Sequence, residues 1–255
     1  MALGIGISGP RGGGGGATPT PTWIGGKSLS IDGVNDIAHG QLCKEIEWNT
    51  YGFGFVMNLP SGSSDTSTRY GIAGFGKING TSNVNAIDVW GRRGQTWFYI
   101  AVDGQLSFLQ KDYTKDVPQF VYVQVSLTTI EIYINGVVTF SVARSNVKYL
   151  KSTDVSLGYG GTYASPILGR FWSPIVTEGN LTSTEVTNLS AAVLSNISPL
   201  TTNKVIDAWD FGTAATGVPS TNQASPTDIK SMVTQSSILC NTTFAAPFGV
   251  VENIT

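Results

Sequence analysis

Apolar and polar residues alternate over several short stretches of this chain, and turn residues separate the stretches. The clearest example is 130–134, which carries isoleucine at every second position and runs into Asn135-Gly136. A tight two-residue hairpin turn requires positive φ angles, which asparagine and glycine tolerate. Apolar side chains then occupy every second position of 138–142. The pattern predicts a β-hairpin whose returning strand places Val138, Phe140 and Val142 on one face.

Other short stretches are rich in β-branched and aromatic residues and end in glycine, proline, asparagine or aspartate, which is typical of strands. These stretches are 28–31, 52–57, 86–90, 96–102, 155–158, 169–172 and 205–211. One more stretch, 120–125, is apolar at most of its positions, so both of its faces are expected to be buried. It is therefore predicted to lie in the interior of a sheet.

A single helix is predicted near residue 183. Thr182 and Glu185 have the spacing of a capping box, in which each side chain bonds the backbone N–H of the other residue. Apolar residues then recur at three- and four-residue steps, which gives one apolar helix face. The members of this face are Val186, Leu189, Val193 and Ile197, and Pro199 is expected to end the helix.

Composition supports this strand-rich interpretation. Charged residues make up 13% of the 255 residues, and Gly, Ser, Thr and Asn are abundant. Ser, Thr and Asn compete with helical hydrogen bonds, and Gly loses much backbone entropy in a helix. The sequence therefore predicts an all-β fold: a two-sheet antiparallel jelly-roll sandwich with one short helix.

The order of these stretches resembles the laminin-G-like, concanavalin-A-like jelly-roll domain. The resemblance covers about residues 23–198 and is carried by 28–36, 132–138, 155–158 and the pair 169–172 with 181–186. Within 199–255, Ala208-Trp209-Asp210-Phe211-Gly212 is similar to a strand that often flanks such domains. The resemblance implies a lectin-like sandwich over residues 23–255.

Residues 1–22 differ from the rest of the chain. They contain a five-glycine run at 12–16 and alternating Thr and Pro at 18–22, so they are expected to form an extended arm outside the fold. Leu3, Ile5 and Ile7 are its candidate anchoring side chains. The arm resembles the N-terminal arms of virion structural proteins of tailed bacteriophages. That resemblance implies other virion proteins as partners, a homo-oligomer, and a location in the virion after assembly in the host cytoplasm.

Charge and hydropathy argue against two classes of partner. The formal net charge is −2, and the only adjacent basic pair is Arg92-Arg93, whereas nucleic-acid backbones require several clustered cations. No apolar run approaches the roughly 20 residues that span a bilayer. Residues 1–16 also lack the basic start and apolar segment of a signal peptide. We expect neither nucleic-acid binding nor a membrane span.

Catalytic residues are not evident. A glycosidase needs two carboxylates across the scissile bond, and Glu45 and Glu47 have a spacing that places both on one face of a strand. They lack the further acids of the laminarinase-type motif. His39, the single histidine, has no serine or carboxylate motif near it. The sequence favours a non-enzymatic protein, with a glycoside hydrolase as the weaker alternative.

Metal chemistry is limited to one candidate. Asp32, Asn35 and Asp36 offer the oxygen ligands that Ca²⁺ prefers, although the same residues are typical of a simple turn. The turn is favoured, no cofactor is expected, and calcium stays as the alternative. Cys43 and Cys240 form no zinc motif and are expected to be part-buried thiols, with one disulfide left open.

Carbohydrate binding requires exposed aromatic faces beside polar side chains. Two predicted loops combine these features, and their candidate residues are Trp90, Arg92, Arg93, Tyr159 and Tyr163. Other aromatics are expected in the core, namely Trp97, Phe98, Phe120 and Trp172. The functional hypothesis is a lectin-like domain displayed on a phage particle as a fibre, decoration or adhesion subunit that binds a host glycan. The alternative is a carbohydrate-binding module of a non-viral system.

Overall fold

The structure is a computed structural model. It describes residues 23, 25–33, 38–41, 49–61, 69–76, 87–92, 97–102, 111–144, 154–158, 167–199, 201–211, 230–231 and 250–254. The arm 1–22 and the thiols Cys43 and Cys240 lie outside the described residues.

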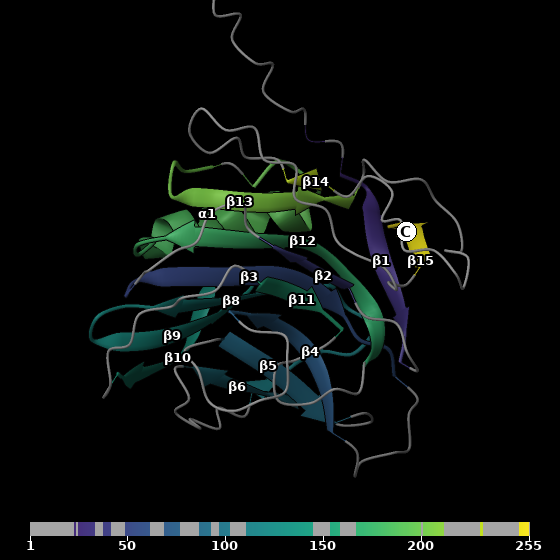
Figure 1. Cartoon of the computed structure of the whole chain (residues 1–255), viewed down its shortest axis with the longest axis horizontal. Coiled ribbons are helices and arrows are strands. Elements are labelled where there is room, and N and C mark those ends of the chain that lie inside the picture. The colour runs from purple at the N-terminus through teal and green to yellow at the C-terminus, as the bar shows by residue number, and fades with distance from the viewer. Residues whose placement is uncertain are drawn as a thin grey trace, which may run out of the picture.

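Two antiparallel sheets form the described part of the chain (Figure 1). The larger sheet has nine strands, in the order β10 (Val137–Ala143), β9 (Thr129–Ile134), β8 (Gln119–Val125), β3 (Tyr51–Asn58), β12 (Leu168–Glu178), β1 (Lys27–Asp32) and β15 (Val250–Asn253), while β13 (Val205–Asp210) pairs with β12 and β14 (Lys230–Ser231) with β13. The smaller sheet has six, in the order β2 (Ala38–Gln41), β11 (Asp154–Leu157), β4 (Arg69–Phe75), β5 (Ile87–Arg92), β6 (Trp97–Val102) and β7 (Lys111–Asp112). Neighbours in each sheet are often distant in sequence, as in a jelly roll. The predicted two-sheet sandwich is confirmed.

The core lies between the two sheets. Phe53 of β3 and Phe75 of β4 come from different sheets, and their rings stack with centroids 5.7 Å apart. Both side chains are fully buried. Because side chains alternate along a strand, these contacts identify the inner face of each sheet, and the neighbouring residues of each strand face outward.

The helix α1 (Ser183–Leu194) covers part of the outer face of the larger sheet, over β8. The predicted capping box is present, with Thr182 and Glu185 each accepting a backbone hydrogen bond from the other. β8 is buried at every position because its inner face meets the core and its outer face meets the helix. This confirms the interior position predicted for 120–125.

The helix ends earlier than predicted. Its last residue is Leu194, and Asn196 takes a left-handed φ of 56° two residues later. Ile197 is therefore outside the helix and is 59% exposed, so its assignment to the apolar helix face is wrong. Val186, Leu189 and Val193 are buried as predicted.

The predicted hairpin is confirmed as β9 and β10, and its turn residues Asn135 and Gly136 have φ angles of 52° and 80°. The returning strand departs from simple alternation. A bulge between Val138 and Phe140 shifts the register, so Val138 pairs with Tyr133 on the outer face. Val138 is 50% exposed, and the prediction that it shares a face with Phe140 is wrong.

β12 is the strand that joins the parts of the larger sheet. β3 pairs with β12 along one edge of β12. On the other edge, β1 pairs with the first half of β12 and β13 pairs with the second half. A register shift between Trp172 and Ile175, with Ser173 at a φ of 49°, separates the two halves. The main contacts of α1 are with β8 and β10, on the other side of β3 from the surface that the first half of β12 forms with β1. Among the described residues, no helix has the length and apolarity needed to cross a membrane.

Candidate functional site

A row of three polar side chains crosses the outer face of the larger sheet. Ser30 of β1 lies directly opposite Arg170 of β12, and Arg170 lies opposite Asn58 of β3. The next row, formed by Leu29, Phe171 and Met57, points into the core and is at most 1% exposed. Ser30, Arg170 and Asn58 are only partly buried. Directly opposed side chains have β-carbons roughly 5 Å apart, so the row can contact one small molecule.

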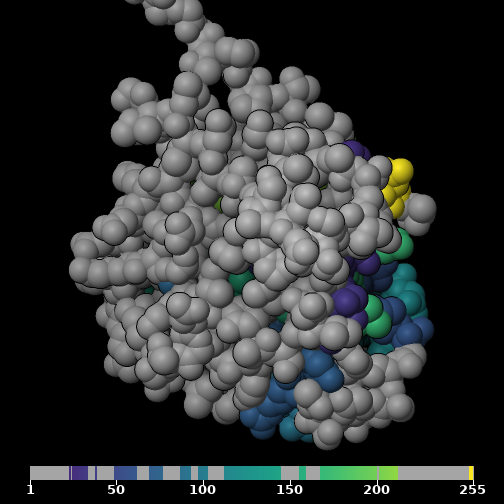
Figure 2. Space-filling view, turned by 45° about the vertical axis from the view of Figure 1, so that its right-hand side comes forward, coloured from purple at the N-terminus to yellow at the C-terminus, as the bar shows by residue number. Residues whose placement is uncertain are grey.

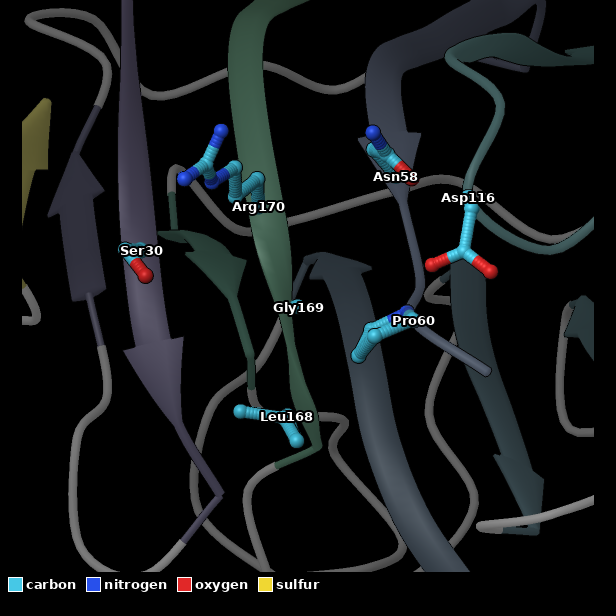
Figure 3. Close-up of a pocket in the computed structure, with 7 residues that line it drawn as sticks. All are labelled: Ser30, Asn58, Pro60, Asp116, Leu168, Gly169 and Arg170. Carbon is cyan, nitrogen blue, oxygen red and sulfur yellow. The ribbon is translucent and has the colours of Figure 1, made fainter. Parts of the chain in front are cut away.

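These side chains line a pocket of about 320 Å³ (Figure 3). Leu168 and Pro60 form apolar walls, and Leu168 is 39% exposed. Gly169 also lines the pocket. A β-carbon on Gly169 would lie 2.6 Å from Leu59 Cδ2 and 3.2 Å from the Asn58 carbonyl oxygen, so a larger residue would force the Leu59 side chain to shift. In Figure 2, atoms of β1 (purple) and β12 (green) reach the surface side by side.

Asp116 supplies the carboxylate of the pocket. Its φ is 58°, in the left-handed region where aspartate is one of the tolerated residues. Its backbone N–H donates to the Leu59 carbonyl at 3.0 Å, and its Oδ1 accepts the Ser61 backbone N–H at 3.1 Å. Hydrogen bonds from the Ser61 side chain and backbone lower the pKa of Asp116, and Lys115 adds to this effect. The pocket therefore contains an ionised carboxylate at neutral pH.

The pocket combines donors, an acceptor and apolar walls. Arg170 and the Asn58 amide donate hydrogen bonds, Asp116 accepts them, and the Ser30 hydroxyl can do either. The volume lies at the lower end of the range for small-molecule sites, which is about 300–1,000 Å³. Of the described residues that line it, only Asp116 carries a carboxylate. The arrangement suits reversible binding of a small hydroxyl-rich ligand.

A second polar group lies on the outer face of the smaller sheet, and we call it the arginine–aromatic cluster: Arg69, Trp90, Arg92, Trp97 and Tyr99. The Trp90 and Tyr99 rings stack at 4.1 Å, and Arg69 Cζ lies 5.1 Å from the Trp90 ring centroid. Trp90 is 2% exposed. Trp97 and Tyr99 are half-buried on the outer face, so the prediction that Trp97 is a core residue is wrong.

The other aromatics expected in the core are buried: Phe98 and Phe120 fully, and Trp172 at 3% exposure. The remaining carbohydrate candidates, Arg93, Tyr159 and Tyr163, lie outside the described residues.

Asp32 has an exposed side chain at the end of β1, and it pairs in register with Leu168 beside the pocket. Its predicted partners Asn35 and Asp36 lie outside the described residues. No group of three or more His, Cys, Asp or Glu side chains that could hold a metal occurs within the described part of the chain. The calcium site stays a prediction.

The catalytic candidates also remain untested. Glu45 and Glu47 lie outside the described residues. His39 belongs to β2, and only the backbone of His39 is described.

Sequence reasoning missed the pocket. Ser30, Asn58 and Arg170 are single polar residues in or at the ends of apolar strands, which is a weak signal for any one of them. Asp116 is one of several aspartates in turn-rich segments. Only the strand order β3-β12-β1 brings positions 30, 58 and 170 into one row.

Comparison with known proteins shows the fold. No protein-family model matches the chain, and no curated protein matches its sequence. The botulinum neurotoxin serotype D ligand binding domain, solved in complex with N-acetylneuraminic acid, is similar in structure with a TM-score of 0.51 and 12% identity, over 65% of this chain and 42% of that chain. The binding domain of serotype G gives a TM-score of 0.50 and 13% identity, over 62% of this chain and 41% of that chain.

The native heptameric SAP-like pentraxin from Limulus polyphemus gives a TM-score of 0.50 and 11% identity, over 66% of this chain and 82% of that chain. The chain thus spans less than half the length of the neurotoxin domains it matches. These likenesses place the described sandwich among jelly-roll folds of the concanavalin-A-like kind, as the sequence resemblance implied.

Proposed function

We propose that this protein is a non-catalytic, lectin-like protein that binds a glycan in the pocket formed by β1, β12 and the end of β3. The observation that carries this proposal is the row Ser30–Arg170–Asn58 with the Asp116 carboxylate in the same pocket. Sugar hydroxyls both donate and accept hydrogen bonds. A site with guanidinium and amide donors beside a carboxylate acceptor matches them.

Five of the lining residues have a direct role in this proposal. Asp116 accepts hydrogen bonds from two neighbouring hydroxyls, and Arg170 and Asn58 donate to ring or hydroxyl oxygens. Leu168 and Pro60 contact the C–H face of the sugar. Retaining and inverting hydrolysis both use a pair of carboxylates, so the single carboxylate among the described lining residues supports binding over cleavage.

The test is glycan-array screening followed by calorimetric titration of the best glycan. Arg170→Gln and Asp116→Asn remove charge while keeping size, and each is expected to weaken binding by about tenfold or more, since charge-assisted hydrogen bonds are lost. Glu178→Gln, which neutralises an exposed carboxylate at the far end of β12, is the matched control. Unchanged affinity in both pocket variants would refute the proposal. Repeating the titration with EGTA tests the calcium prediction for Asp32, Asn35 and Asp36.

We also propose that the domain is displayed on a bacteriophage particle as a fibre, decoration or adhesion subunit, anchored by residues 1–22 and assembled as a homo-oligomer. The support is the arm's sequence, in which Leu3, Ile5 and Ile7 alternate with small residues ahead of a glycine run. Removing 1–22 should leave the melting temperature nearly unchanged but abolish incorporation into particles that lack the native copy. Normal incorporation of the truncated protein would favour the free carbohydrate-binding module instead.

A further inference from the structure

The smaller sheet presents two arginines side by side on its outer face. Arg69 of β4 and Arg92 of β5 are directly opposed in the antiparallel register. The inner faces of the same strands are occupied by buried apolar residues such as Ile87 and Val89, so the arginines point away from the core. Like charges directly opposite each other destabilise a sheet.

Aromatic rings hold both arginines in place. Arg69 Cζ is 5.1 Å from the Trp90 ring centroid, and Arg92 Cζ is 5.8 Å from that of Trp97. Tyr99 joins the two indoles, stacking on Trp90 at 4.1 Å and meeting Trp97 edge-on at 4.7 Å. The contacts form a continuous series from Arg69 through Trp90, Tyr99 and Trp97 to Arg92. β4, β5 and β6, which carry it, lie next to one another in Figure 1.

A guanidinium that stacks on a ring directs its N–H groups outward in its own plane, at right angles to the stacking contact. Stacking also restricts the side chain before any ligand arrives, which lowers the entropy lost on binding. Arg69 is exposed, and Arg92 is partly exposed although its Nε is buried with no hydrogen-bond partner. Arg69 and Arg92 occupy directly opposed strand positions, and each offers the planar donor group that binds a carboxylate or sulfate.

We propose that the arginine–aromatic cluster binds an oxyanion, either a sulfate ester or a carboxylate, carried by an acidic glycan. The half-buried rings of Trp97 and Tyr99 beside Arg92 offer contact area to the adjoining sugar. Two cations in a chain of net charge −2 are too few for a nucleic-acid backbone, which needs several phosphate contacts. This site lies on the other sheet from the glycan pocket and does not depend on it.

The experiment is calorimetric titration of the full-length protein at low ionic strength with four probes: a sulfated oligosaccharide, a uronate oligosaccharide, their uncharged counterpart and inorganic sulfate. Arg69→Gln and Arg92→Gln are each expected to weaken binding of at least one acidic probe by about tenfold or more. Arg92→Lys keeps the charge but loses the planar fork, so it should fall between Arg92→Gln and wild type. Lys27→Gln, which removes a cation of the larger sheet outside both proposed sites, should bind the acidic probe like wild type. Far-ultraviolet circular dichroism and a thermal melt verify that each variant is folded.

Comparing the titrations with the sulfated and the uronate oligosaccharide identifies whether the bound oxyanion is a sulfate or a carboxylate. Higher NaCl concentrations should weaken either complex because exposed charges are screened. The proposal is overturned if no acidic probe binds more tightly than its uncharged counterpart. It is equally overturned if folded Arg69→Gln and Arg92→Gln proteins bind like wild type, or if the control Lys27→Gln weakens the binding as much as they do. Tighter binding of single-stranded DNA than of any acidic glycan would also refute it.

Discussion

The turn between β9 and β10 gives a sharp test of how the helix is attached to the sheet. Gly136 has a φ of 80°, and a β-carbon built on it would lie 2.9 Å from Thr187 Cα and 3.2 Å from Ser190 Cβ, both in α1. The Gly136 carbonyl also accepts a hydrogen bond from Thr187 Oγ1 at 3.2 Å. Gly136→Ala therefore introduces both a backbone strain and a collision with the helix.

The two effects can be separated with a second glycine. Gly179 has a similar φ of 71°, but nothing lies within 4 Å of its β-carbon position. Gly179→Ala should cost only the left-handed strain of an L-residue, about 1–2 kcal/mol. Gly136→Ala adds overpacking against the helix backbone, typically about 1–3 kcal/mol, so its total should be about 2–5 kcal/mol.

Urea unfolding followed by tryptophan fluorescence measures the loss of unfolding free energy in both variants. Thermal melts provide a check, because each kcal/mol lost lowers the melting temperature by about 2–4 °C in a domain of this size. Equal slopes of free energy against urea in the two variants would show that the difference reflects the folded state. If Gly136→Ala costs no more than Gly179→Ala, the turn does not contact α1 as described and the reasoning fails.

The remaining predictions concern the helix cap and a buried hydroxyl pair. Hydrogen bonds from the Thr182 backbone and from Lys204 lower the pKa of Glu185 from 4.5 to about 2. Because this pKa is depressed in the folded state, the stabilisation is present above pH 4.5 and is lost as the pH falls towards 2. Glu185→Gln should remove this part of the acid dependence of the unfolding free energy, which is worth up to about 1 kcal/mol for so exposed a group. An unchanged dependence of stability on pH in this variant would contradict the prediction. Tyr122→Phe removes the partner of the buried Thr177 hydroxyl, 2.7 Å away, and should cost about 1–3 kcal/mol in urea unfolding. Tyr133→Phe is its control and should cost less, because Glu131 is only partly buried and can recover its hydrogen bond from water; equal costs would argue against this account.

The candidate site shows why sequence reasoning reached the fold and not the pocket. The hairpin at 135–136, the capping box at Thr182 and the central strand 120–125 were all predicted, because each is encoded by residues that lie within a few positions of one another. The pocket depends on Ser30, Asn58 and Arg170, which are separated by 28 to 140 positions in the chain. No local pattern encodes which strands become neighbours.

By itself, the sequence determined the class of fold, the turn geometry and the start of the helix. Side-chain period, positive-φ tolerance and capping are properties of short segments, so they can be read without knowing the rest of the chain. Only the tertiary structure decided which polar residues meet and which aromatic rings stay accessible. The bulge after Val138 and the outward position of Trp97 depend on strand pairing. The contacts of Trp90 with Arg69 and Tyr99, which come from neighbouring strands, depend on it too. Burial is a property of the packed sheet, and a single strand cannot specify what covers its outer face.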